Sequence, residues 1–552
     1  MSDRIGAELE SLRKQAKRWL ASLRAGDLEA LARLERVLPQ HSARPGLREV
    51  QQALAHEQGF ASWAQLKEHH QLLALTPEGL ENELLQNACI FSGGPLDFPH
   101  KWRRAERIRV LHPALATASI HAAVVCGEVE HVARLLQRDP SLATVAGGPQ
   151  RWEPLLLVCY GRMPNERFAD NSIAIAKLLL DAGADAGTSF IHPDGELRFF
   201  ALTGVMGHGE MGAPEHPRAD ELARLLLARG ANPNDSQGLY NTHLGADDPK
   251  WLRLLFEHGL GPHDRCNWHA RAEDVAKADP ILSYLVAQAA ANGHLRRLTC
   301  LLEHGADPNA RSIYDGKSCW QAATIVGRTD LAELLAKHGA RTEPLEGVDA
   351  FVSACNLGDR ERAAALLDGH PEYLEHSDPL IDAASHGRRD AVAIMLALGF
   401  DPNRPGRHGH LPLHNACKDR PISELLLAHG ADPRARVYGG TAAGWARHAN
   451  APEMARFFAE HSRDLLDAVL AGHVALATGL LREDPSRIRE RNPRGATALH
   501  LLPDDPELAR ALVELLLAHG IDTTAVDRDG RTAAASLEAE GLDELADLLD
   551  CG

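Results

Sequence analysis

Apolar residues recur along most of this chain at the spacing of short amphipathic helices. A Leu-Leu pair at Leu301-Leu302 returns 33 residues later at Leu334-Leu335, and a His-Gly-Ala triplet follows each pair. Polar turn residues, including Asp315-Gly316, lie between the two pairs. A period near 33 residues, built from a turn and two short apolar helices, predicts a repeat protein. One such helix pair cannot bury its apolar faces alone, so neighbouring units must stack on both sides.

Each part of this unit has a physical task. We expect Ser318 to cap the first helix by accepting a hydrogen bond from a free backbone N–H. Gly327 should end that helix, and Gly339 should adopt the left-handed conformation that ends the second helix. Leu331, Leu334 and Leu335 lie on one face of the second helix and predict its buried stripe.

Comparable apolar pairs recur about thirteen times between Leu135 and Leu548. Most steps are near 33 residues, whereas two steps of 47 and one of 43 indicate inserted loops, and a step of 23 indicates a unit without its hairpin. We divide the chain into an N-terminal helical region (1–75), a connector (76–112) and a repeat array (113–552) that is irregular at about 185–280. Trp19 and Trp63 are expected to be buried in the N-terminal region, which is a candidate cap or extension of the array.

The array resembles the ankyrin repeat family. The segments that carry the resemblance are PLHNA (412–416), LLLAHGADPRA (425–435), GATALHLL (495–502) and DRDGRTAAA (527–535). The resemblance implies an all-α solenoid of helix-turn-helix units, hairpins on one side, and a concave groove that recognises a protein partner. The irregular stretches are similar to those of bacterial multi-ankyrin proteins of unassigned activity. The resemblance implies no catalytic residue.

Charge and cysteine usage narrow the function classes. The 552-residue chain has a formal net charge of −17, which does not favour a bulk attraction to nucleic acid. The basic run HKWRRAERIR (100–109) leaves open a local patch for nucleic acid or an acidic partner. Nine cysteines without a C-x-x-C pair indicate free thiols in a reducing, cytoplasmic compartment. We expect no signal peptide and no membrane span, because no run of about 18 apolar residues is present.

Most histidines have a structural interpretation. One set, before the helix-ending glycines, is expected to interact with the last turn of its helix. It consists of His304, His338, His429 and His519. A second set, His121, His414 and His500, matches the family's TPLH histidine, which the resemblance implies will bridge neighbouring hairpins.

Two segments are candidates for chemistry in the irregular region. His263, Cys266 and His269 have a spacing that fits three metal ligands, although no fourth ligand is evident nearby. The glycine-rich stretch 204–212 lacks the lysine of a phosphate-binding loop, but its His208 and Glu210 lie close to His216 and would be a further metal candidate. The alternative function is therefore a metal-dependent or enzymatic module that uses residues 185–280. Because no catalytic motif is present, we expect no enzyme and no cofactor.

The first hypothesis is a non-catalytic interaction protein whose concave groove holds a protein partner of unknown identity. Alignment to the family's repeat pattern places ten residues at groove or hairpin positions. They are Tyr314, Arg407, His408, His410, Asn415, Lys418, Tyr438, Trp445, Arg447 and His448. Exposed aromatic residues and arginine contribute most of the binding energy at many interfaces. The open alternative for Trp445 is that it packs against the next unit.

Overall fold

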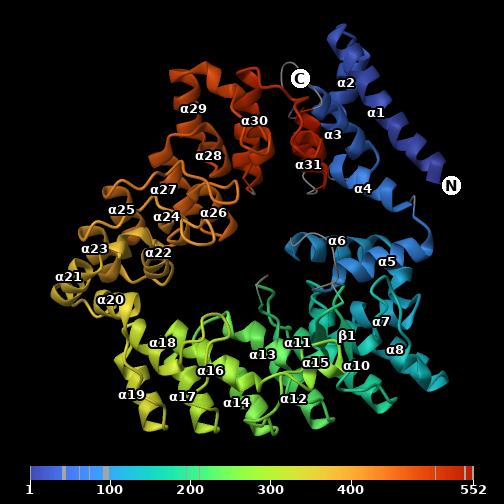
Figure 1. Cartoon of the computed structure of the whole chain (residues 1–552). Coiled ribbons are helices and arrows are strands. Elements are labelled where there is room, and N and C mark those ends of the chain that lie inside the picture. The colour runs from blue at the N-terminus through green and yellow to red at the C-terminus, as the bar shows by residue number, and fades with distance from the viewer. Residues whose placement is uncertain are drawn as a thin grey trace. The chain divides into compact units, whose positions relative to one another are not determined.

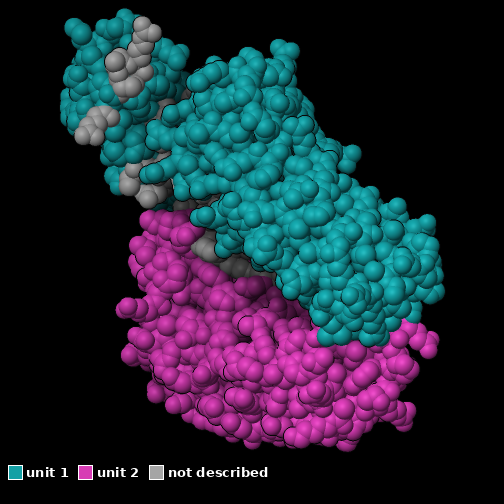
Figure 2. Space-filling view, turned by 90° about the vertical axis from the view of Figure 1, so that its left-hand side faces the viewer, with its two compact units in different colours: residues 1–74, 347–552 teal, residues 75–346 magenta. Residues whose placement is uncertain are grey.

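The computed structural model describes residues 2–39, 41, 45–60, 63–73, 75–90, 98–193, 195–209, 212–503, 505–539 and 543–549. The chain separates into two compact units, shown in Figure 2. Unit 1 contains residues 1–74 and 347–552, and unit 2 contains residues 75–346. The boundaries at residues 75 and 112 stay predictions, because the division into two compact units does not test them.

Unit 2 is built from two rows of helices (Figure 1). The first helices of successive pairs contact one another in one row, and the second helices form the other row. The first row consists of α7 (Ile120–Cys126), α9 (Pro154–Tyr160), α11 (Ala201–Met206), α13 (Ser236–His243), α16 (Ile281–Asn292) and α18 (Cys319–Ile325). The second row consists of α8 (Val129–Arg138), α10 (Glu166–Asp181), α12 (Ala219–Ala228), α14 (Lys250–Glu257), α17 (Leu295–Glu303) and α19 (Thr329–Lys337).

Short elements begin and interrupt these rows. Helices α5 (Pro77–Ala88) and α6 (Phe98–Leu111) pack on each other and on the 3₁₀ helix η1 (Pro113–Thr117), and α5 also contacts α7. The loops hold η2 (Pro140–Thr144), α15 (Ala272–Val275) and an antiparallel pair, β1 (Ser189–Ile191) with β2 (Arg198–Phe200), in which Phe190 faces Phe199. The segment expected to be irregular therefore contains real insertions, but α11 still contacts both α9 and α13, and the first row continues through it.

The repeat of residues 301–340 folds as its sequence predicts. The backbone N–H of Gln321 donates to Ser318 Oγ at 3.2 Å, so Ser318 caps α18. Gly327 and Gly339 have φ angles of 73° and 94°, the left-handed region that ends each helix. Leu331 and Leu335 are fully buried. The helix cap, the helix-ending glycines and the buried leucines of this repeat thus favour the same structure as the stacking of the units.

Unit 1 repeats the two-row arrangement. Its first row consists of α20 (Gly347–Asn356), α22 (Asp378–Ser385), α24 (Pro412–Asn415), α26 (Ala442–His448), α28 (Leu465–Leu470), η5 (Ala498–Leu501) and α31 (Ala533–Ala539). Its second row consists of α21 (Arg360–Gly369), α23 (Arg389–Ala397), α25 (Arg420–Ala428), α27 (Pro452–Ser462), α29 (Val474–Glu483), α30 (Pro506–Ala518) and α32 (Asp543–Leu549). The 3₁₀ helices η3 (Pro371–Glu375) and η4 (Pro485–Arg489) follow α21 and α29. Only Arg463 and Asp464 separate α27 from α28, so the hairpin expected to be missing is missing.

The N-terminal helices form a cluster within unit 1. They are α1 (Ser2–Arg24), α2 (Leu28–Val37), α3 (Leu47–Glu57) and α4 (Trp63–Leu73). Trp19 and Trp63 are 4% and 3% exposed, which confirms that both are core residues. Trp19 Nε1 donates to Ala30 O at 3.0 Å, joining α1 to α2. Helices α3 and α4 also contact α32, the last helix of the array.

The cysteines of the described residues are free and buried. Burial raises the pKa of the Cys89, Cys126, Cys319 and Cys355 thiols to about 12. These side chains therefore pack as small apolar groups and hold little thiolate at neutral pH. Cys551 lies outside the described residues. Among the described helices, none has the length and apolar character needed to cross a lipid bilayer.

Candidate functional site

Two neighbouring hairpins of unit 1 bring an aromatic group to the surface. Val437 and Gly440 pair across the hairpin before α26, and Tyr438 at its tip has a positive φ of 51°. Thr441 caps α26 by accepting from the Gly444 N–H at 3.3 Å, which fixes the start of the helix that carries Trp445. His410 comes from the preceding hairpin, just before α24. Sequence-distant side chains thus meet because consecutive hairpins lie side by side.

The rings of this aromatic group contact one another closely. Tyr438 and Trp445 are stacked, with centroids 6.5 Å apart and planes at 15°. His410 meets Tyr438 edge-on at 5.5 Å and Trp445 edge-on at 5.4 Å. The Tyr438 hydroxyl donates to His408 O at 2.8 Å, and Trp445 Nε1 donates to Val437 O at 3.3 Å. Tyr438 remains 67% exposed, whereas Trp445 is half-buried, so the group is ordered by its own contacts and still presents a face to solvent.

His414 supports this group from beneath. Its ring is fully buried and meets Trp445 edge-on at 5.6 Å. Its Nε2 donates to Gly440 O at 3.3 Å, and burial lowers its pKa to about 4, so the ring is neutral at pH 7. His121 and His500 make the equivalent bonds to Val145 O and Arg531 O, at 2.8 and 3.2 Å. The bridging role expected of the TPLH-type histidines is confirmed in all three repeats.

The remaining candidate residues of unit 1 surround the aromatic group. Arg407 is 84% exposed and reaches Asp378 Oδ2 at 3.3 Å. His408, Lys418 and His448 are exposed, and Asn415 is half-buried with an Oδ1 that accepts no hydrogen bond. Arg447 donates to Leu501 O at 3.3 Å, which directs its guanidinium toward η5. The structure thus places eight of the ten candidates on α24, α26 and their hairpins, and Lys418 in the turn between α24 and α25.

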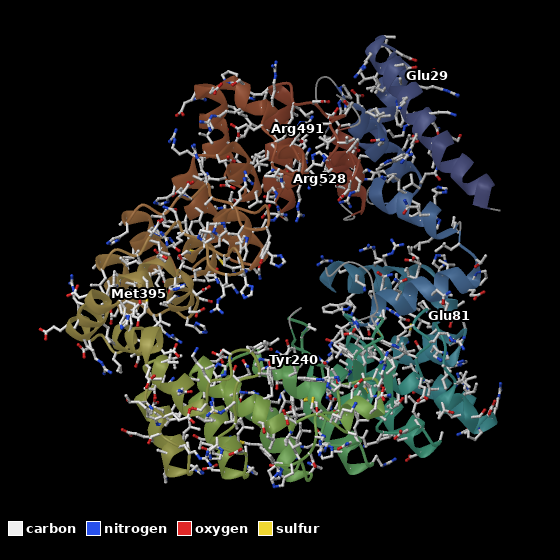
Figure 3. All side chains as sticks on the ribbon, viewed as in Figure 1. Glu29, Glu81, Tyr240, Met395, Arg491 and Arg528 are labelled. Atoms are coloured by element: carbon white, nitrogen blue, oxygen red, sulfur yellow. The ribbon has the colours of Figure 1, made fainter. Side chains whose placement is uncertain are left out.

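Tyr314 belongs to unit 2 and to a different cluster. It is 70% exposed, and its hydroxyl lies 3.3 Å from the Tyr284 hydroxyl. Tyr284 in turn contacts Tyr240, labelled on α13 in Figure 3, and Trp268, each at 5.9 Å between centroids. Sequence reasoning missed this group because its members come from two helices and two loops without a shared period. The sequence carries no distinct signal for this group, because residues 240–314 hold six Phe, Trp and Tyr residues and the shorter stretch 152–200 holds as many.

The three histidine and cysteine metal candidates are not brought together. His263 is exposed, whereas Cys266 is 6% exposed and burial raises the pKa of its thiol to about 11. The His269 ring instead packs against Trp268, whose Nε1 donates to His269 Nε2 at 3.2 Å. Within the described ranges, no group of three or more His, Cys, Asp or Glu side chains is arranged to hold a metal ion.

The described part of the glycine-rich stretch begins in α11 and continues into a turn. His208 pairs with Ala213 across it, and His208 Nε2 lies 3.3 Å from Glu215 Oε1. Lys250 Nζ and Trp251 Nε1 donate to Glu215 at 2.8 and 2.9 Å. The hydrogen bonds from His208, Lys250 and Trp251 lower the pKa of the Glu215 carboxyl to about 2. His216 is 3% exposed and burial lowers its pKa well below the usual value. Glu210 lies outside the described residues.

Part of the basic run on α6 is neutralised locally. Arg104 pairs with Glu83 of α5 at 2.9 Å, and Arg109 pairs with Glu106 at 2.5 Å. Lys101 is half-buried, and burial lowers the pKa of its amine. The run therefore does not form a continuous cationic face.

The histidines that precede the helix-ending glycines act on their own helices. Nδ1 of His304, His429 and His519 donates to the carbonyl four residues earlier, at 2.8, 2.9 and 2.8 Å. These carbonyls belong to the last turn of each helix, which lacks intrahelical donors. The structural interpretation of these three residues is confirmed.

Comparisons with known proteins agree with the repeat architecture. No protein-family model matches the chain. An ankyrin repeat-containing protein of Treponema pallidum (strain Nichols) is 30% identical over 143 residues, which cover 24% of this chain and 48% of that protein. Cyclin-dependent kinase 4 inhibitor B of Bos taurus is 44% identical over 55 residues, 10% of this chain and 42% of the inhibitor. Ankyrin repeat and SOCS box protein 16 of Mus musculus is 44% identical over 52 residues, 9% of this chain and 12% of that protein.

The chain thus spans less than half the length of each of these relatives. Among solved structures, the ankyrin repeat domain of Bcl-3 covers 36% of this chain and 97% of its own, at 20% identity and a TM-score of 0.25. That score is too low to add to the fold, which rests on the helix rows, the capped hairpins and the bridging histidines. These features form an ankyrin-type solenoid, and over the matched segments the chain is similar to ankyrin repeat proteins.

Proposed function

We propose that this chain is a non-catalytic interaction protein that holds a protein partner against the hairpins and first-row helices of unit 1. The observation that carries the proposal is the aromatic group of exposed Tyr438 with half-buried His410 and Trp445. Large aromatic side chains that are already ordered lose little conformational entropy on binding, which favours them as anchors. Arg407 adds an exposed cation beside them.

The relatives support an interaction role in general terms only. One is named as an inhibitor of a cyclin-dependent kinase, and that description concerns the relative. The enzymatic or metal-dependent alternative in residues 185–280 has no comparable support, because no group of three or more His, Cys, Asp or Glu side chains among the described residues is arranged to hold a metal ion. A non-enzymatic role for this chain is part of the proposal, and so is a cytoplasmic, bacterial setting.

The test is partner capture with matched variants. Full-length protein with Trp445→Ala and Tyr438→Ala is compared with wild type and with Tyr314→Ala, an exposed tyrosine in the other unit. Captured proteins are identified by mass spectrometry and then titrated as purified proteins. Truncating an anchor residue costs about 2 kcal/mol or more of binding, or at least about thirtyfold in Kd.

Thermal unfolding provides the folding control. Because Trp445 is half-buried, the double variant should lose about 1–2 kcal/mol of stability. Retained stability with lost partner binding supports the proposal. Collapse of unit 1 would assign both residues to the core, and undiminished partner binding by a folded double variant would refute the proposal.

A further inference from the structure

Arginines accumulate on the row of hairpins that leads away from the aromatic group. We define the hairpin row as residues 404–410, 434–440, 489–496 and 526–531 of unit 1. These segments contain nine arginines and three carboxylates, a net charge of +6 with histidine neutral, whereas the whole chain has a net charge of −17. The sign of this surface is therefore opposite to that of the protein.

Printed contacts place the four segments next to one another. The Tyr438 hydroxyl donates to His408 O, joining the first two segments. A Cβ added at Gly439 would lie 3.7 Å from Arg494 Nε, so the Arg494 side chain reaches the second segment. Arg494 can extend this far because the repeat between the second and third segments has no hairpin. Arg528 N donates to Arg494 O at 2.7 Å, and Arg491 Nη1 donates to Val526 O at 3.3 Å, which joins the last two.

Several of these arginines form no ion pair within the described part of the chain, although Asp467 and Asp522 attract Arg436 and Arg491 from farther away. Among the described residues, no carboxylate lies within ion-pair distance of Arg436, Arg491, Arg494 or Arg528, in contrast to Arg531, which pairs with Asp529 at 3.0 Å. The side chains of Arg436 and Arg491 bond instead to the hairpin carbonyls Gly439 O and Gly495 O, at 3.2 and 3.3 Å, and these neutral acceptors leave each guanidinium without an ion-pair partner among the described residues. Figure 3 labels Arg491 and Arg528 near one another, beside α30 and α31.

We propose that the hairpin row binds an extended acidic segment of the partner protein, which continues from the aromatic group along Arg436, Arg494, Arg491 and Arg528. The proposal rests on the proposed function and specifies the chemistry of its partner. Neighbouring repeats are about 10 Å apart, and the repeat of α28, which has no hairpin, lies between the second and third segments, so the four segments span about 40 Å. An extended chain of about twelve residues covers that length. Guanidinium groups suit carboxylates because their planar donors match two oxygens at once.

Fluorescence anisotropy with a defined probe tests the inference. The probe is a fluorescein-labelled twelve-residue peptide that alternates Glu and Ser and contains one Phe; its control carries Lys in place of Glu. Full-length protein should bind the Glu peptide saturably, and the Kd should rise with added salt. Each exposed ion pair contributes about a two- to fivefold change in Kd, so replacing Arg436, Arg491, Arg494 and Arg528 together by Glu should weaken binding at least about tenfold.

A charge-matched variant separates this site from the overall charge. Arg360, Arg362, Arg389 and Arg482 are exposed arginines on second-row helices of the same unit, and replacing all four by Glu changes the net charge equally. This control should bind the Glu peptide within about threefold of wild type, because it retains the hairpin row. If the hairpin variant does not fold, the double variant Arg436→Gln with Arg494→Gln should still lose at least about threefold.

Four outcomes would overturn the inference. They are equal loss in both fourfold variants, equal binding of the Lys peptide, tighter binding of a single-stranded oligonucleotide of the same charge, and self-association that is lost in the hairpin variant. The last two would assign the row to nucleic acid or to a second copy of the chain. If an identified partner loses affinity with Trp445→Ala and Tyr438→Ala but not with the hairpin variant, the proposed function stands and this inference fails.

Discussion

Replacing Arg162 by Met tests how the inserted segment is held to the array. Arg162 is 4% exposed, and its guanidinium donates to four backbone carbonyls and to no carboxylate. The acceptors are Cys159 O at 3.1 Å, Gly161 O at 2.8 Å, Gly204 O at 2.6 Å and Pro214 O at 3.0 Å. The side chain therefore connects α9 to α11 and to the chain that leads into α12.

The expected loss of stability in Arg162→Met is the difference between two opposing effects. Met removes the donors and leaves four carbonyls unpaired, at about 1.5 kcal/mol each, or about 6 kcal/mol. It also removes a buried charge, and burial lowers the pKa of Arg162 from 12.5 to about 10, which corresponds to about 3 kcal/mol of desolvation. The net loss is about 3 kcal/mol, to be felt locally because repeat arrays open in parts.

Hydrogen exchange with mass spectrometry measures this loss by segment. Amides of 201–209 and 212–217 should exchange about a hundredfold faster in Arg162→Met, while those of 319–337 stay unchanged. The control is Arg218→Met, which removes only a surface pair with Glu221 and should change exchange less than about fivefold. Unchanged exchange at 201–217 in Arg162→Met would refute the assigned role of Arg162.

Two further predictions concern stability. Asp467 is 3% exposed, and burial raises the pKa of its carboxyl to about 6 from an ordinary value of about 3.9. Because the folded state holds this proton more tightly than the unfolded state, the stability that Asp467 contributes is present at low pH and is lost as pH rises through about 6. Between pH 5 and pH 8, wild type should therefore lose about 1 kcal/mol more stability than Asp467→Asn, measured by denaturant titration, and parallel pH profiles would contradict this. A Cβ at Gly127, whose φ is 75°, would lie 2.8 Å from Arg167 O, so Gly127→Ala should cost about 3 kcal/mol. Gly183→Ala, with a φ of 104° and nothing within 4 Å, should cost about 1 kcal/mol in the same melting experiment, and equal losses would show that the contact with Arg167 is unimportant.

Much of the fold was predictable because its determinants are local. The cap at Ser318, the glycines at 327 and 339, and the paired leucines each lie within one repeat, and the period repeats them. Arg162 was not predictable, because its acceptors Gly204 O and Pro214 O lie 42 and 52 residues away and backbone carbonyls leave no mark in a sequence.

The candidate site likewise has residues that the sequence could place and residues that it could not. Tyr438 and Trp445 could be placed by alignment to the repeat pattern, and the structure brings them together. Their role in binding stays a prediction. The cluster around Tyr240 and Tyr284 could not be placed, because loops of unequal length carry Trp268 and Tyr314 to it. The unpaired state of Arg436 and Arg528 likewise depends on which carboxylates neighbouring repeats supply, which the sequence of one repeat does not specify.

The central claim is that a protein partner is held by the hairpins and first-row helices of unit 1. Hydrogen exchange of the full-length chain with and without a purified partner tests it most directly. The account predicts slower exchange at 405–411 and 436–448 on binding, with no change in the second-row helices α21, α23 and α25. Slower exchange confined to those second-row helices, with 405–411 and 436–448 unaffected, would contradict it.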